Sequence, residues 1–164
     1  MQTFADLLER LLLAPGRNTK ITLLRGYFAA TPDPARGYAL AAIAGALDIP
    51  GAKAAMLKDL AQTRTDPVLF ALSYDFVGDL AETIALIWPG EGNNPPGLGA
   101  VIETLRAAKR EAIPGLVATW LDDCSPSARI ALIKLLTGGL RVGASLRLAK
   151  LALAELGQID VNEI

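Results

Sequence analysis

The stretch from Lys134 to Arg147 combines glycines, a serine and cationic side chains in a pattern that suits phosphate binding. Glycines lack a Cβ, so a ligand can approach the backbone, and several N–H groups can point in one direction. A helix that begins near Ser145 adds free N–H donors and a partial positive charge. The residues predicted to face phosphate are Lys134, Gly138, Gly139, Arg141, Gly143, Ser145 and Arg147.

The same stretch is also compatible with a plain corner between two helices, in which glycine ends one helix and the arginines lie in solvent. It is not a Walker loop, because no Gly-Lys-Ser/Thr sequence follows. A second candidate group contains Arg17, Asn18 and Lys20, which flank a predicted helix start. These side chains either bind phosphate or lie in solvent at the end of a helix.

Several kinds of catalytic site are excluded by composition. The chain has no His and a single Cys, Cys124, so it holds no Ser-His-Asp triad, no His-ligated zinc and no internal disulfide. Asp122 and Asp123 lack partners at metal-ligand spacing and are interpreted as charges at a helix end. Asp79, after Gly78, is interpreted as a helix N-cap. Trp88 and Trp120 are expected in the core, and Cys124 is expected to be a buried or half-buried small residue.

Charge is distributed unevenly along a chain whose net charge is only −1. Residues 1–100 have a net charge of −2, and residues 151–164 have a net charge of −3. Residues 101–150 hold eight basic and four acidic side chains, a net charge of +4. This local excess of positive charge is what a surface that binds nucleic acid needs.

The elements that must position these residues are predicted to be helices. Ala and Leu supply 56 of the 164 residues, whereas Val, Ile and Thr supply 27. Ala and Leu favour helices and β-branched residues favour strands, so we expect an all-α protein, an irregular bundle of about ten short helices. The predicted helices are one capped by Thr3 that ends at Pro15-Gly16, then 18–30, 35–47, 52–63, 68–74, 80–88, 98–108, 113–121, 127–136 and 145–156.

Pro and Gly mark where these predicted helices begin and end. Asp33-Pro34, Asp66-Pro67 and Ser125-Pro126 each place a capping residue before a proline, which is typical of a helix start. Residues 89–99 contain four Gly, three Pro and two Asn. We therefore expect one domain, 1–164, with lobes of about 1–88 and 98–164 joined by this loop.

The run 136–143, Leu-Thr-Gly-Gly-Leu-Arg-Val-Gly, resembles the signature near the end of the N-terminal DNA-binding domain of ATP-dependent DNA ligases. In that family a Gly-x-x-Arg-x-Gly corner contacts the DNA backbone. Residues 70–83, with Gly78-Asp79-Leu80, look like a stretch in the middle of the same domain. Residues 4–13, 17–21, 27–28 and 31–40 are similar to the start of its bacterial branch. The resemblance covers nearly the whole chain.

The resemblance implies non-sequence-specific binding of nicked double-stranded DNA through backbone and minor-groove contacts, in DNA repair, replication or recombination. The DNA-binding residues would be the seven of the 134–147 stretch together with Arg17 and Lys20. A ligase also needs a Lys-x-Asp-Gly motif, and neither Lys58-Asp59-Leu60 nor Lys53-Ala54-Ala55 fits it. The chain alone should therefore be inactive.

The missing motif implies a fragment of a longer enzyme. Its nucleotidyltransferase and oligonucleotide-binding domains would be further partners, and the acidic run 157–164 is where the next segment would begin. We expect no cofactor in this chain, and ATP and magnesium only for the full-length ligase.

The sequence favours a bacterial cytoplasmic protein, associated with the nucleoid when bound to DNA. Asp6 stands where a signal peptide needs a basic residue, and the longest apolar run, near 38–47, is too short to span a membrane. A single Cys fits a reducing compartment. The alternative function is a helical protein-interaction scaffold with no role in nucleic-acid binding.

Overall fold

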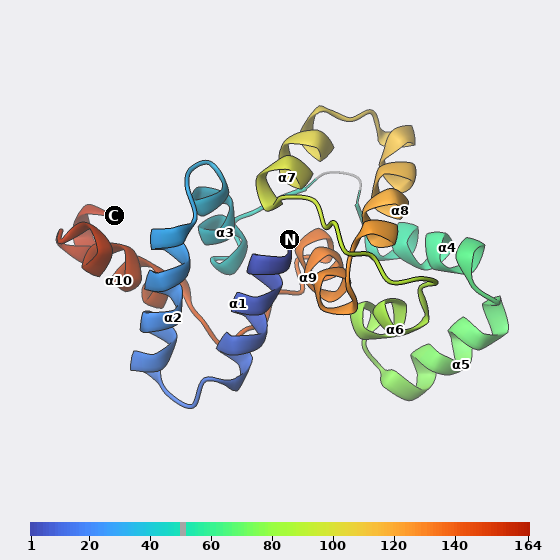
Figure 1. Cartoon of the computed structure of the whole chain (residues 1–164), viewed down its shortest axis with the longest axis horizontal. Coiled ribbons are helices and arrows are strands. Elements are labelled where there is room, and N and C mark those ends of the chain that lie inside the picture. Colours follow the sequence, from blue (N-terminus) through green and yellow to red (C-terminus); the bar gives the residue numbers. More distant parts are fainter. Residues whose placement is uncertain (50–51) are drawn as a thin grey trace. The chain divides into compact units, whose positions relative to one another are not determined.

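The computed structural model describes residues 1–49 and 52–164, and these residues form helices and loops without any strand (Figure 1). The prediction of an all-α protein with about ten helices is confirmed. None of the described helices is both long and apolar enough to cross a membrane. The elements are α1 (Gln2–Leu13), α2 (Arg17–Ala30), α3 (Ala35–Ile43), α4 (Ala54–Arg64), α5 (Pro67–Val77), α6 (Leu80–Ile87), α7 (Leu98–Ala107), η1 (Arg110–Ala112), α8 (Ile113–Asp123), α9 (Pro126–Thr137), α10 (Leu146–Gly157) and η2 (Val161–Glu163).

The chain divides into two compact units. Unit 1 contains Met1–Ala5 and Asp48–Gly139, and unit 2 contains Asp6–Leu47 and Leu140–Ile164. This division differs from the predicted lobes, because the Pro/Gly-rich loop 89–99 lies inside unit 1. Its backbone is bonded to the end of α8, with Gly92 N–H donating to Cys124 O over 3.3 Å and Asn94 N–H donating to Asp123 O over 3.1 Å. The loop is therefore a packed part of the unit.

Helix α9 forms the centre of unit 1. It packs against α6, while α4, α5 and α8 contribute further helix pairs to the same unit. A helix that is apolar on all sides is stable only when neighbours surround it. Seven of its residues are buried: Ala128, Arg129, Ala131, Leu132, Ile133, Leu135 and Leu136.

Unit 2 is built on the pair formed by α2 and α10, which lie side by side in Figure 1. Helix α2 buries Ile21, Leu24 and Phe28. Helix α10 buries three alanines, at positions 149, 152 and 154, and small side chains allow two helices to approach closely. Helices α3 and η2 also pack against α10.

Four predicted helix starts are confirmed by side-chain caps. Asp66 accepts from Val68 N–H and Leu69 N–H over 2.9 and 2.8 Å. Asp79 caps α6, Ser125 caps α9 and Ser145 caps α10, each by accepting a backbone N–H three residues further on. Each cap satisfies donors that the first turn of a helix leaves without an intrahelical partner.

Two predicted caps are wrong. Pro34 occupies the N-cap position of α3, no side chain caps that helix, and Asp33 instead forms an ion pair of 3.8 Å with Arg36. Helix α1 already begins at Gln2, so Thr3 lies inside its first turn. A capping residue must stand directly before the first helical residue, and these two do not.

The predicted core residues are mostly buried, and the exceptions lie at helix ends or edges. Trp88 and Cys124 are buried as expected, whereas Trp120 is partly exposed. Leu12, in the last turn of α1, is 58% exposed although it is apolar. Helix α3 ends at Ile43, four residues before its predicted end.

Candidate functional site

Helix α9 ends at Thr137, directly before the two glycines with which the predicted corner begins. Gly138 adopts φ +72°, and its N–H donates to the carbonyl of Lys134. Gly139 N–H donates to the same carbonyl over 3.0 Å. Gly138 can take this left-handed conformation without the cost that a Cβ imposes. Both glycines belong to the end of unit 1.

The following turn belongs to unit 2 and leads into α10. Gly143 has φ +62°, and Ser145 accepts from Leu148 N–H over 3.4 Å. The first turn of α10 thus begins where the sequence predicted, with the positive end of the helix dipole beside the glycine turn. Val142, directly before Gly143, is 4% exposed and anchors the turn.

Lys20 joins the two groups of residues that the sequence singled out. Its Nζ donates to the carbonyl oxygen of Gly143 over 2.9 Å, across 123 positions of the chain. Lys20 lies in the first turn of α2, and Arg17 is the first residue of that helix. Within unit 2, the start of α2 and the turn before α10 therefore form one neighbourhood.

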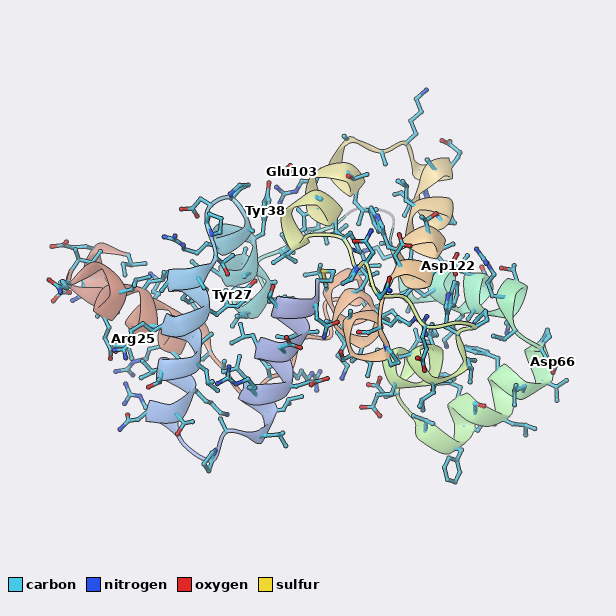
Figure 2. The ribbon with its side chains drawn as sticks, in the orientation of Figure 1. Arg25, Tyr27, Tyr38, Asp66, Glu103 and Asp122 are labelled. Carbon is cyan, nitrogen blue, oxygen red and sulfur yellow. The ribbon has the colours of Figure 1, made fainter. Side chains whose placement is uncertain are left out.

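Three arginines of unit 2 that the sequence predicted as DNA contacts are exposed: Arg17, Arg141 and Arg147. Unit 2 contains eight Lys or Arg side chains and six Asp or Glu side chains. Arg25, which Figure 2 labels, is partly neutralised, because its Nη1 lies 3.3 Å from Glu155 Oε2 of α10. The neighbourhood is thus moderately positive, and its backbone contributes further donors.

Lys134 has an acidic partner within unit 1. Its Nζ lies 3.8 Å from Asp79 Oδ2, and its side chain is 24% exposed. This ion pair with the cap of α6 offsets the charge of Lys134. Lys134 therefore contacts a carboxylate of its own unit.

The acidic residues near the end of α8 have structural roles. Asp122 accepts from the indole Nε1 of Trp88 over 2.9 Å and forms an ion pair of 3.2 Å with Arg64. Over residues 1–49 and 52–164, no group of three or more acidic or cysteine side chains is arranged to hold a metal ion. The interpretation of Asp122 as a helix-end charge agrees with these contacts.

Arg129 was not singled out by sequence, yet it holds part of unit 1 together. It is 1% exposed and donates to the carbonyls of Leu121, Trp88 and Gly90 over 2.8, 3.3 and 2.7 Å. Desolvation lowers the pKa of Arg129, and nearby acidic groups partly oppose that effect. Its one sequence signal is a charge inside the apolar run of α9.

The sequence matches no protein-family model and no curated protein. The resemblance to ligase DNA-binding domains therefore rests on the motifs at 70–83 and 136–143 and on the matches nearer the start of the chain.

Proposed function

We propose that this chain binds nicked duplex DNA without sequence specificity, as the N-terminal DNA-binding domain of an ATP-dependent DNA ligase. The observation that carries the proposal is the hydrogen bond from Lys20 to Gly143. This bond joins the start of α2 to the Gly-x-x-Arg-x-Gly corner. The sequence pattern predicts each of these two segments, separately, as phosphate-binding.

The arrangement in unit 2 is suited to phosphate. Arg141 and Arg147 flank the turn before α10, and Arg17 stands at the start of α2. Guanidinium groups can bind a phosphate with two parallel N–H donors, and the first N–H groups of α10 add partial positive charge. Contacts of this kind carry no base information, so binding should tolerate any sequence.

The ligase chemistry that joins a 3′-hydroxyl to a 5′-phosphate would belong to nucleotidyltransferase and oligonucleotide-binding domains outside this chain. In the proposed function this chain holds the DNA for those domains, and ATP and magnesium serve the full-length enzyme. The role assigned to the present residues is to bind and position the backbone on either side of the nick.

The test measures binding of fluorescent nicked and intact duplexes over a range of salt concentrations. Arg141→Ala should weaken binding to all sequences alike and reduce the slope of log K against log salt by about one. Arg110→Ala is the matched control, because it removes an exposed arginine from unit 1 and should leave binding unchanged.

The alternative, a helical scaffold that binds only proteins, predicts a different outcome. Duplex binding would then be absent, or it would not respond to Arg141→Ala more than to Arg110→Ala. Either result would remove the phosphate-binding role from the corner.

A further inference from the structure

Helix α5 exposes an apolar face. Val68, Leu69, Leu72 and Phe76 are 66, 53, 64 and 92% exposed. At about 100° of rotation per residue, these four side chains fall within roughly 100° of the helix circumference. Phe70, which is 3% exposed, lies on the opposite side of the helix and faces the core of unit 1. Single exposed apolar residues are ordinary, but four on one helix face are typical of an interaction site.

The neighbouring helix, α6, also exposes an apolar side chain. Helix α6 packs against α5 and exposes Leu86 at 73%. Glu82 stands one turn before Leu86 and is also exposed. Residues four positions apart share a helix face, so α6 presents an apolar side chain beside a negative charge.

The surroundings of the α5 face are acidic. The segment 66–87, which covers α5 and α6, contains four Asp or Glu and no Lys or Arg. Asp75, exposed and three residues after Leu72, borders the apolar face, and Asp66 caps the start of α5 (Figure 2). Such a border repels phosphate groups and attracts cations.

The nearest cations in sequence do not neutralise this border. Lys58 of α4 lies 4.8 Å from the ring centroid of Tyr74, whose position on α5 is away from the apolar face. Arg64, at the end of α4, forms its ion pair with Asp122 and lies over the Trp88 ring. Lys134 offsets the charge of Asp79, the cap of α6, so the acidic side chains that remain to meet a partner are the exposed Asp75 and Glu82.

We propose that the exposed face of α5 docks a cationic amphipathic helix of a partner protein. Apolar side chains at spacings of three and four along the partner would cover Leu69, Leu72 and Phe76, as in other helix-on-helix recognition. Lys or Arg side chains beside that stripe would meet Asp75 and the other acidic side chains. The apolar contact supplies affinity, and the charges select a basic partner over an acidic one.

The experiment uses the full chain and two fluorescent synthetic helices as probes. One helix has Leu at positions i, i+3, i+4 and i+7 with Lys elsewhere, and the other has Glu in place of Lys. In anisotropy titrations the Lys helix should bind at least about tenfold more tightly than the Glu helix, and added salt should reduce that difference.

Protein variants then locate the contact. Leu72→Ser and Phe76→Ser should each weaken binding of the Lys helix about tenfold, because each removes a large apolar contact. The matched control is Leu13→Ser, which removes an 83% exposed leucine from α1 and should not change binding. All three positions are exposed, so circular dichroism should show the parent helix content in each variant.

Three results would overturn the proposal. Binding of the Lys helix that is unaffected by Leu72→Ser and Phe76→Ser would place its site elsewhere. Equal binding of the two helices would remove the selection by charge. A dimer in sedimentation equilibrium that Phe76→Ser dissociates would show that a second copy of this chain covers the face.

Discussion

Arg129 is a charged side chain with almost no access to solvent. Burial of a charge is costly unless hydrogen bonds satisfy it, and Arg129 donates to three backbone carbonyls. Two of these carbonyls, of Trp88 and Gly90, belong to the segment between α6 and α7, and the third, of Leu121, belongs to α8. One side chain of α9 thereby ties an irregular segment to the core of unit 1.

Arg129→Met should lower the free energy of unfolding by about 3 kcal/mol or more. An unsatisfied buried polar group costs about 1–3 kcal/mol, and this substitution leaves several carbonyls without their donor. Urea denaturation followed by circular dichroism measures the loss. Arg110→Met, at an exposed position, should change stability by no more than about 0.5 kcal/mol. Equal effects of the two substitutions would show that the three hydrogen bonds contribute little.

We expect Cys124 to make stability sensitive to alkaline pH. Burial raises the pKa of its thiol from 9.0 to about 11, and the charges of the N-terminal amine and Arg129 partly counter that rise. The native state therefore keeps a proton that the unfolded chain releases, so stability is full below pH 9 and falls as pH rises toward 11. Urea denaturation at several pH values should show a steeper decline for the parent than for Cys124→Ala. Parallel profiles would contradict a buried thiol.

At the scale of elements, the caps and turns decide where helices begin and end. Gly143 is the turn residue on which the candidate site depends most. A Cβ at Gly143 would lie 2.6 Å from Lys20 Nζ, and the φ of +62° is unfavourable for a residue with a side chain. The flexible end of Lys20 can move away, but the backbone conformation cannot change without changing the turn.

Gly143→Ala should reduce the free energy of unfolding by about 1–2 kcal/mol and weaken DNA binding as Lys20 is displaced. Gly26→Ala is the control in the same unit. Gly26 lies inside α2, and a Cβ there would have no atom within 4 Å, so its substitution should stabilise the helix by about 0.5–1 kcal/mol. Thermal unfolding compares the two. A stabilising Gly143→Ala would mean that the turn does not require glycine.

At the scale of the whole molecule, the two units differ in charge. Unit 1 holds eleven Asp or Glu and eight Lys or Arg, whereas unit 2 holds six and eight. This partition is consistent with a phosphate-facing role for unit 2 and a protein-facing role for α5. With a net charge of −1, we expect DNA affinity in the range of about 10⁻⁴–10⁻⁶ M at physiological salt. Nanomolar binding that does not change with salt concentration would contradict binding through contacts with the DNA backbone.

The chain should form no covalent adenylate when it is incubated with ATP and magnesium. Adenylation in ligases requires the lysine of a Lys-x-Asp-Gly motif, which this sequence does not contain. Intact-mass spectrometry measures the adduct directly. A stable AMP adduct would contradict the interpretation of the chain as a DNA-binding domain alone.

The sequence by itself determined the helices, because their signals are local. Ala and Leu favour helix residue by residue, and Asp66, Asp79, Ser125 and Ser145 cap helices by bonding to N–H groups no more than three positions away. The prediction of Asp33 as a cap is wrong, because α3 begins at Ala35, one residue later than a cap at position 33 requires.

Only the tertiary structure decided which segments meet. Lys20 and Gly143 lie 123 positions apart, and Arg129 reaches carbonyls 8, 39 and 41 positions away. Such contacts depend on how whole helices pack, and packing is set by shape and burial across the unit. For the same reason the Pro/Gly-rich loop 89–99, which looks like a linker in sequence, is bonded into unit 1 by its backbone. Gly92 allows that approach, because a Cβ at this position would overlap the backbone at the end of α8.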